Sequence, residues 1–232
     1  MRPSLLLVLG LALLPGCTDD AGLCATGQQR DTQIVVTSQL HFVVPDEDGV
    51  SEGFDLDGRV SGEKDTPSCS RRDYVAPDGT PGIDNQFSEL WKVLIAAVGD
   101  AVEGLIQGVI NDGTLLLIFR VEGIDDPVND SCVNVSLFKG AGRPDLGTDG
   151  FIAPSQTFDV AAGTPFTQTA GYIEDGVLHA GPFDTVIPLA IFQVVADLEL
   201  EGAFLEARFT EEGGLSGIIA GGVRDEQIMQ VA

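Results

Sequence analysis

Basic residues and histidines are scarce in this chain of 232 residues. Its 12 lysines and arginines stand against 36 aspartates and glutamates, which gives a formal net charge of −24. Such a charge repels the phosphate backbone of nucleic acids and anionic lipid surfaces. The only histidines of the sequence, His41 and His179, are too few for a histidine-rich zinc or catalytic site. The sequence therefore argues against nucleic-acid binding and excludes a histidine-rich catalytic or zinc site.

The motifs of common enzyme classes are also missing. The sequence contains no Gly-x-Ser-x-Gly elbow, phosphate-binding loop, His-Glu-x-x-His pair or dinucleotide fingerprint. Two carboxylates could in principle act as acid and base, but the acidic residues are so numerous that their spacing singles out no pair. We therefore predict a non-enzymatic protein.

The apolar run near the N-terminus, residues 5–14, is short. A membrane-spanning helix needs about 20 apolar residues, so this run is typical of a cleaved signal peptide instead. It follows Arg2 and ends in Leu14-Pro15-Gly16-Cys17. This tetrad resembles the lipobox of bacterial lipoproteins, in which cleavage falls before the cysteine and its sulfur receives a diacylglycerol. The resemblance implies a signal peptide at residues 1–16, lipidation of Cys17 and membrane attachment through this lipid.

Residues 17–31 are mostly small and polar, which is typical of a flexible tether. In bacterial lipoproteins the residue after the cysteine influences sorting between membranes, and here it is Thr18 rather than aspartate. By that resemblance we expect a place at the outer membrane of a bacterial cell envelope. The rest of the chain is similar to bacterial envelope lipoproteins in general character only, and this resemblance implies no particular activity.

Three cysteines remain once Cys17 carries a lipid: Cys24, Cys69 and Cys132. An odd number in an oxidising compartment predicts one disulfide and one leftover cysteine. Cys69 and Cys132 lie in polar, loop-like stretches inside the expected domain, whereas Cys24 lies in the tether. We therefore predict a disulfide between Cys69 and Cys132, with three free thiols as the alternative.

An acidic stretch at residues 44–87 holds the candidate metal site. Short Asp-x-Asp-Gly segments bring carboxylates together, and calcium takes about six to eight oxygen ligands in flexible geometry. The stretch does not fit the EF-hand pattern. The alternative is that these segments are ordinary acidic turns. The candidate calcium ligands are Asp46, Asp48, Asp55, Asp57, Asp78 and Asp84.

Periodicity predicts the secondary structure. Alternating apolar residues predict a strand over residues 32–44. Apolar residues recurring every three or four positions predict one long amphipathic helix over residues 85–110, capped by Asp84 or Asn85. Later apolar stretches, separated by turn residues, predict strands at residues 114–121, 132–138, 151–160, 167–173, 176–180, 185–195, 197–209 and 215–223.

This order of elements predicts an α+β fold over residues 32–232. In it, an antiparallel β-sheet meander packs on one long amphipathic helix to form a single globular domain. The alternative is a β-sandwich with an inserted helix. Both layouts give the acidic stretch the role of a long connection between the first strand and the helix.

Two functions follow from these predictions. The first is a lipid-anchored, non-enzymatic cell-envelope protein with a calcium-stabilised binding or structural module. The alternative is a periplasm-facing carrier of an apolar or lipid ligand, because the strand at residues 185–195 is apolar on both faces and must be covered on both. A plain core explains the same pattern, since a domain of this size needs apolar surface to fold. The partner would be a protein or an apolar ligand.

Overall fold

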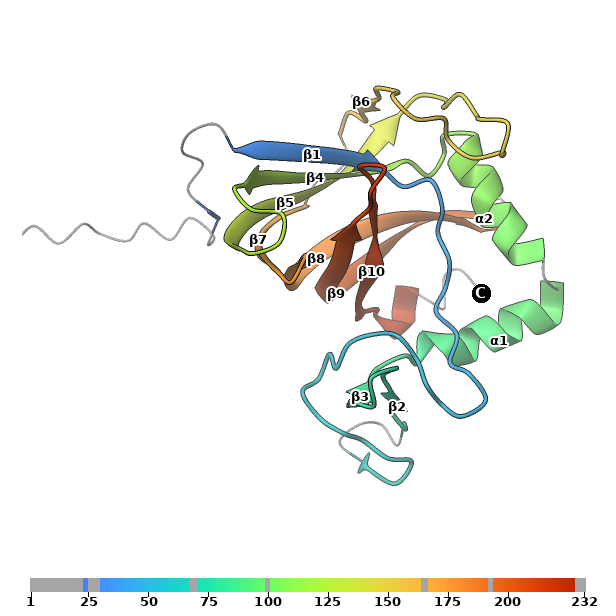
Figure 1. Ribbon diagram of the computed structural model, residues 1–232. Helices are drawn as coiled ribbons and strands as arrows, with labels where there is room; N and C mark the ends of the chain where they lie inside the picture. Colours follow the sequence, from blue (N-terminus) through green and yellow to red (C-terminus); the bar gives the residue numbers. More distant parts are fainter. Residues whose placement is uncertain are drawn as a thin grey trace, which may run out of the picture.

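One antiparallel sheet carries most of the chain in the computed structural model, which describes residues 23–24, 30–66, 71–98, 101–163, 167–191 and 194–227 (Figure 1). The strands are β1 (Asp31–Val36), β2 (Tyr74–Val75), β3 (Pro81–Ile83), β4 (Leu117–Ile124), β5 (Asp130–Ala141), β6 (Asp159–Val160), β7 (Thr167–Glu174), β8 (Val177–Ile191), β9 (Val194–Phe209) and β10 (Leu215–Gly222). The helices are α1 (Phe87–Val98) and α2 (Ala101–Asn111). The large sheet has the order β1-β4-β5-β7-β8-β9-β10, with β6 beside β5, and β2 pairs with β3 separately.

Tight turns make the second half of the sheet a meander. Between β7 and β8, Asp175 and Gly176 have φ angles of 50° and 74°. Positive φ at both central residues defines the turn that matches the natural twist of a two-stranded hairpin, and Asp-Gly is a favoured pair there. At the β9–β10 turn, Thr210 donates its amide to the Gly214 carbonyl at 3.0 Å. The sequence prediction of these two hairpins is confirmed.

The longest hairpin joins β8 and β9. The strand predicted at residues 176–180 and most of the strand predicted at residues 185–195 lie in the single strand β8, whereas Val194 and Val195 begin β9. The pairing register shifts on either side of Phe183. Such irregularities bend a strand and increase its twist, so they help the sheet to curl. The strand predicted over residues 151–160 is wrong in extent, because only β6 is a named strand there.

The prediction of one long amphipathic helix over residues 85–110 is wrong. Two helices of 12 and 11 residues stand there, and the chain changes direction between them (Figure 1). A continuous helix would bury Leu105, yet Leu105 is 42% exposed while Ile106 and Ile110 are 3% and 0% exposed. The buried face of α2 is therefore not the continuation of the apolar stripe that the sequence suggested.

The predicted fold class is corrected accordingly. The described residues form a mostly β structure, a curled antiparallel sheet accompanied by short helices, rather than an α+β fold with one long helix. Nor do the described residues form the alternative, a sandwich of two sheets, because their main strands follow one another in a single sheet. Local turn chemistry dictates the meander, but the curl arises from irregular pairing, which periodicity does not encode.

The core lies between the curled sheet and the two helices. Trp91, Ile106 and Ile110 from the helices join the inward residues of β4, β5, β7, β8 and β9 in one cluster of buried apolar side chains. Those inward residues are Leu117, Val121, Ile124, Val133, Val135, Leu137, Ile173, Leu178, Ala180, Phe183, Ile187, Leu200, Ala203, Leu205 and Ala207. The sheet and helices therefore bury a shared interior.

Residues 37–44 cross from the end of β1 toward α1 outside the named strands (Figure 1). The sequence predicts that the first strand continues to Val44, but β1 ends at Val36. Phe42 instead contacts the helix, with its ring centroid 4.4 Å from that of Trp91 and 4.9 Å from that of Phe87. This aromatic packing explains why the alternating pattern outlasts the strand.

The predicted disulfide is also corrected. Cys132 on β5 is bonded to Cys24, 108 residues earlier in the chain, and not to Cys69, which lies outside the described residues. The Cys24 backbone is fixed on Asn134, which accepts the Cys24 amide at 2.9 Å and donates to the Cys24 carbonyl at 3.1 Å. The segment predicted as a tether is therefore attached to the sheet at residue 24.

Candidate functional site

The acidic stretch forms a lobe beside one end of the large sheet, around the small β2–β3 ribbon (Figure 1). A bridge between Val50 and Val75 fastens its first turn to β2. Further along, Phe54 places its ring 5.9 Å from that of Phe204 on β9, and its carbonyl accepts the Asp84 amide at 2.9 Å. Apolar anchors and backbone hydrogen bonds thus give the acidic loop a defined shape.

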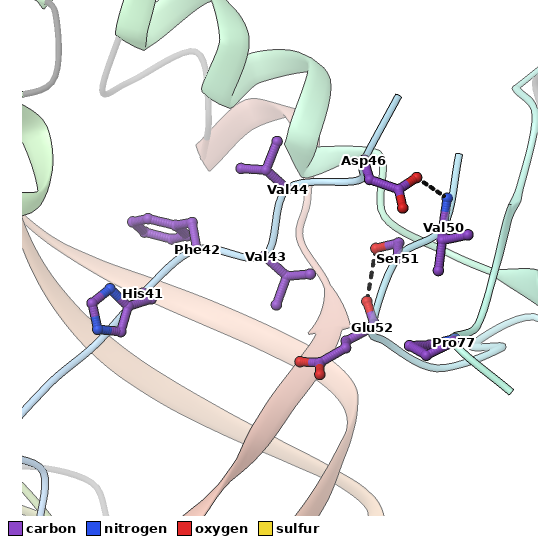
Figure 2. A pocket seen from close by; sticks show the side chains of 9 residues that line it. All are labelled: His41, Phe42, Val43, Val44, Asp46, Val50, Ser51, Glu52 and Pro77. Atoms are coloured by element: carbon purple, nitrogen blue, oxygen red, sulfur yellow. Dashed lines mark hydrogen bonds between the residues drawn. The ribbon is translucent and has the colours of Figure 1, made fainter. Parts of the chain in front are cut away.

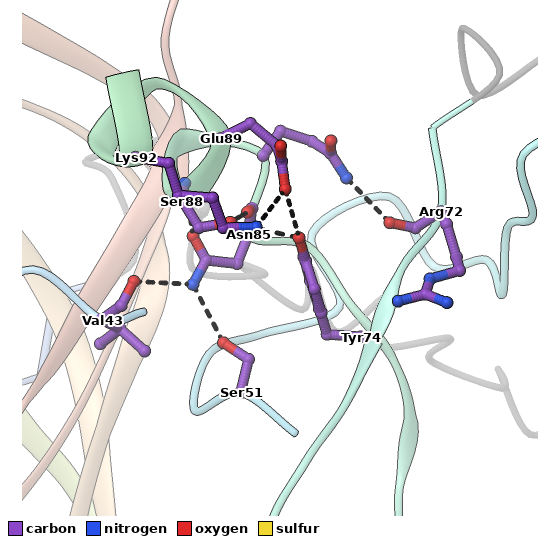
Figure 3. Close-up of polar contacts among 9 residues, drawn as sticks. Val43, Ser51, Arg72, Tyr74, Asn85, Ser88, Glu89 and Lys92 are labelled. Carbon is purple, nitrogen blue, oxygen red and sulfur yellow. Dashed lines mark hydrogen bonds and ion pairs between the residues drawn. The ribbon is translucent and has the colours of Figure 1, made fainter. Parts of the chain in front are cut away.

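A polar network joins this lobe to the start of α1 (Figure 3). The Asn85 amide nitrogen donates to the Val43 carbonyl at 3.0 Å and to the Ser51 hydroxyl at 2.9 Å. Its carbonyl oxygen accepts the Ser88 amide at 3.2 Å, which satisfies one of the free amides at a helix N-terminus. The prediction that Asp84 or Asn85 caps the helix is confirmed for Asn85. One side chain therefore positions two loop segments and the helix.

Tyr74 and Glu89 extend the network along the first turn of α1 (Figure 3). The Tyr74 hydroxyl donates to the Glu89 carboxylate at 3.2 Å, and Lys92 donates to the same carboxylate at 2.7 Å. The hydrogen bond and the charge of Lys92 hold the pKa of Glu89 below its ordinary value. This arrangement keeps Glu89 ionised near the positive end of the helix dipole, where a negative charge is favoured.

Three of the six predicted calcium ligands come together. Ligand oxygens of Asp55, Asp57 and Asp84 all lie within 4.8 Å of one another, although Asp84 is far from the other two in sequence. Oxygens bound to one calcium ion at about 2.3–2.6 Å lie at most about 5 Å apart, so the spacing fits this ion. The donor set consists of carboxylates, the ligands that hard cations such as calcium prefer.

Each carboxylate of this triad already fixes the loop through one oxygen. Asp84 Oδ2 accepts the amides of Leu56 and Asp57 at 2.8 and 3.3 Å. Asp55 Oδ1 accepts the amides of Gly58 and Arg59, and Asp57 Oδ1 accepts the Arg59 amide. Within the described part of the chain, the second oxygen of each carboxylate has no hydrogen bond, so it can bind a cation without disturbing the loop.

Gly82 leaves space on one side of the triad. A β-carbon at this position would lie 3.2 Å from Asp55 Oδ2 and 3.2 Å from the Arg59 carbonyl oxygen. With φ at +99°, the position also favours glycine. A larger residue here would crowd both Asp55 and the Arg59 carbonyl, while the Arg59 guanidinium extends to Asp65 at 3.7 Å.

Burial and, to a smaller extent, neighbouring negative charges raise the pKa of one triad member. Burial raises the pKa of the Asp84 carboxyl above its ordinary value of 3.8, and the negative charges of Asp57 and Asp73 add to this effect. The hydrogen bond from the Leu56 amide lowers it, but not enough to compensate. Three clustered carboxylates are therefore destabilising when no cation is bound.

We expect the raised pKa of Asp84 to show in the pH dependence of stability without calcium. A carboxyl with a raised pKa binds protons more tightly in the folded chain, so its contribution to stability declines as pH rises from 3.8 through the folded-state pKa. The wild type should lose stability relative to Asp84→Asn over this window. Urea unfolding between about pH 3 and pH 7 measures the difference.

Asp78→Asn serves as a control of opposite sign. Hydrogen bonds from Thr80 lower the pKa of Asp78, so its contribution to stability is present above 3.8 and is lost as pH falls. The wild type should therefore gain stability relative to Asp78→Asn as pH rises. Equal slopes for the two variants would contradict a raised pKa of Asp84.

The remaining predicted ligands lie in turns of their own. Asp46 Oδ1 accepts the amides of Asp48 and Val50 at 3.0 and 2.8 Å, and Asp78 Oδ1 accepts the Thr80 amide at 2.9 Å. These are the local hydrogen bonds of ordinary acidic turns. The structure does not bring Asp46, Asp48 or Asp78 into the triad.

A second feature of the lobe is an open hollow of about 370 Å³ beside residues 41–44 (Figure 2). Sequence reasoning missed it, because its walls come from segments that only the folded chain brings together. Its lining residues are His41, Phe42, Val43, Val44, Asp46, Val50, Ser51, Glu52 and Pro77. The surface of the hollow is mostly apolar, and Asp46 and Glu52 add carboxylates to it.

Both histidines have glutamate partners. His179 Nδ1 lies 3.2 Å from a Glu206 oxygen, and its ring stacks on Tyr172 with centroids 4.8 Å apart. His41 Nδ1 lies 3.9 Å from a Glu103 oxygen. The His179 contact links the neighbouring strands β8 and β9, and the His41 contact links residues 37–44 to α2. Each contact therefore has a structural explanation.

The origin of the chain has to be inferred from its own residues. No family model matches the sequence, and no curated protein or solved structure matches it either. Cys17 and the tetrad that resembles a lipobox lie outside the described residues. Among the helices that the structure describes, none has the length and apolar character needed to cross a membrane.

Proposed function

We propose that this chain is a lipid-anchored, non-enzymatic protein of a bacterial cell envelope, and that its acidic lobe is a calcium-stabilised binding or structural module. The approach of Asp55, Asp57 and Asp84 to within 4.8 Å is the observation that supports the calcium-stabilised module most directly. Like charges this close favour a cation between them. Calcium would join the turn at residues 55–59 to Asp84, which directly precedes the helix cap at Asn85.

Calcium is expected to stabilise the wild type. With a dissociation constant of about 1 mM, as in extracellular calcium modules, about 10 mM calcium adds about 1.4 kcal/mol to the free energy of unfolding. For a domain of this size the increase raises Tm by about 3–6 °C. Asp57→Asn should abolish most of this rise, because it removes one ligand charge. Thermal unfolding followed by circular dichroism, with calcium or with chelator, measures the effect.

Asp78→Asn is the matched control for this experiment. Asp57 and Asp78 are both exposed, and each accepts the amide two residues ahead, an acceptor role that asparagine retains. Asp78→Asn should keep the full calcium response. In chelator, Asp57→Asn should be at least as stable as the wild type, since it relieves repulsion. A wild-type Tm that does not change between calcium and chelator would rule out the cation.

The anchor is proposed from the Leu14-Pro15-Gly16-Cys17 tetrad, and we place the protein at the outer membrane on the basis of Thr18. Cys17→Ser is expected to abolish incorporation of labelled palmitate and to leave the precursor unprocessed or the protein soluble. Membrane fractionation and intact mass measure both effects. Cys69→Ser, as a control, should keep the label. Unchanged fractionation and mass in Cys17→Ser would refute lipidation.

The carrier alternative has less support. The inward side chains of the sheet pack with Trp91, Ile106 and Ile110 in one buried cluster, so the described interior is occupied by protein. The apolar strands β8 and β9 pair with each other inside the large sheet. Native mass spectrometry of protein purified from a membrane-rich host separates the two functions. A lipid that co-purifies in fixed ratio would favour the carrier.

A further inference from the structure

The hollow in the acidic lobe combines an apolar surface with negative charge. Phe42, Val43, Val44 and Val50 supply apolar lining, while Asp46 and Glu52 supply carboxylates, and neither lysine nor arginine is among the lining residues. Val44 is 45% exposed, although exposed valine gains from being covered. Figure 2 shows Val43 and Val44 pointing to opposite sides of their segment. The hollow therefore offers apolar contact next to negative charge.

The backbone beside the hollow is available for pairing. Residues 41–44 belong to no named strand. Across the described residues, the only hydrogen bond to this backbone is the one from Asn85 to the Val43 carbonyl. A segment with free amides and carbonyls is a template to which a further strand can add, and such additions are a common mode of peptide recognition.

The position of this backbone is fixed before any partner arrives. Asn85 holds Val43 and Ser51 on either side of its amide nitrogen, at 3.0 and 2.9 Å. Phe42 is held by the rings of Phe87 and Trp91. A binding segment that is already ordered loses little conformational entropy on association, which favours affinity.

Charge selects the kind of partner. The carboxylates of Asp46 and Glu52 border the hollow, Glu47 and Asp48 follow in the exposed turn, and the chain as a whole carries −24. Arg72 approaches this turn at Gly49 but does not line the hollow. A cationic partner would be attracted, whereas nucleic acids and anionic lipids would be repelled.

We propose that this hollow binds an extended segment of a partner protein in which apolar residues alternate with lysine or arginine. The apolar side chains contact Val44 and Val50, the basic ones meet Asp46 and Glu52, and the segment's backbone pairs with residues 41–44. This interaction goes beyond the proposed function, since it requires neither the lipid nor calcium.

A library of random decapeptides displayed on yeast tests the proposal. Selection on the purified full chain, carried out in chelator and repeated in calcium, should enrich peptides with lysine or arginine alternating with apolar residues. Their affinity should fall as salt is raised, because exposed charge pairs are screened. A selection that enriches no peptide, or only peptides without basic residues, would overturn the proposal, whatever the calcium result.

Variants of the hollow and of a distant turn test where the selected peptides bind. Glu52→Lys is expected to weaken a selected peptide about three- to tenfold in fluorescence anisotropy, since it reverses one exposed contact charge. Val44→Lys should weaken it at least as much by adding charge to the apolar surface. Glu211→Lys, an equal charge change in the exposed β9–β10 turn, should stay within about twofold. All three should keep the wild-type circular dichroism spectrum.

Two outcomes would assign the affinity elsewhere and overturn the proposal. Equal weakening by Glu52→Lys and Glu211→Lys would mean that the peptides respond only to net charge. A chain that forms dimers in analytical ultracentrifugation, with dimerisation abolished by Val44→Lys and no peptide selected, would mean that the hollow binds a second copy.

Discussion

Replacing Cys24 with serine is expected to lower the free energy of unfolding by about 2–5 kcal/mol, the typical cost of removing a native disulfide. The bond to Cys132 closes a loop of 108 residues, and the stabilisation in the chain-entropy account increases with loop length. Urea unfolding at neutral pH under non-reducing conditions measures the change. Cys132→Ser should be destabilised to a similar extent.

The cysteine series also tests the pairing itself. Cys69→Ser should unfold like the wild type, and the double replacement of Cys24 and Cys132 should cost little more than either single replacement. If the bond instead joined Cys69 to Cys132, Cys69→Ser would be the destabilised variant and Cys24→Ser would not. Peptide mapping of the oxidised chain provides the same answer independently.

Trp91→Ala is expected to cost about 3–5 kcal/mol, the usual range for removing a large buried aromatic side chain. Trp91 is 2% exposed and joins the core cluster, and its ring contacts Phe42 from the crossing segment. The variant therefore loses core packing and the aromatic contact that holds residues 37–44 against α1. Chemical unfolding followed by circular dichroism measures the loss.

Leu105→Ala is the control for this second prediction. Leu105 also lies in a helix of the same region but is 42% exposed, so its truncation should change the free energy of unfolding by no more than about 0.5 kcal/mol. If Leu105→Ala cost as much as Trp91→Ala, the apolar stripe of a single continuous helix would describe the chain better than α1 and α2 do.

The second half of the sheet was the most predictable part of the fold. Turn residues such as Asp175 and Gly176 have a strong local preference, and the strands around them pair with their sequence neighbours. The break between α1 and α2 was not predictable from periodicity. Ile106 and Leu105 are both apolar, so the pattern fits either face, and only packing on the curled sheet selects Ile106 for burial.

The sequence predicted that aspartates form the candidate site, but not which of the six aspartates come together. Six aspartates shared the same local signal, an acidic residue near a glycine turn, and this signal fits both metal ligands and turn formers. Asp84 joins Asp55 and Asp57 because its carboxylate accepts the Leu56 and Asp57 amides, a contact across 27 or more residues. Contacts at such separation are set by tertiary structure.

Cys24 shows the same limit in another way. Its polar, small neighbours predicted a tether, and composition describes the flexibility of a free segment only. The two hydrogen bonds with Asn134 and the bond to Cys132 come from β5, more than 100 residues away. No feature within residues 17–31 distinguishes a cysteine that pairs with β5 from one that stays free.

The long separation between Cys24 and Cys132 has a consequence for the order of events during synthesis. A chain made from its N-terminus exposes Cys24 and β1 well before their partners on β5 and β4 exist, whereas β7 and β8, or β9 and β10, become available almost together. Closing a short loop costs less entropy than closing a long one. We therefore expect the C-terminal hairpins to form soon after they are made. Formation of the Cys24–Cys132 disulfide, with the oxidant of the compartment taking up the two electrons, would then mark a chain whose strand β5 has already been synthesised.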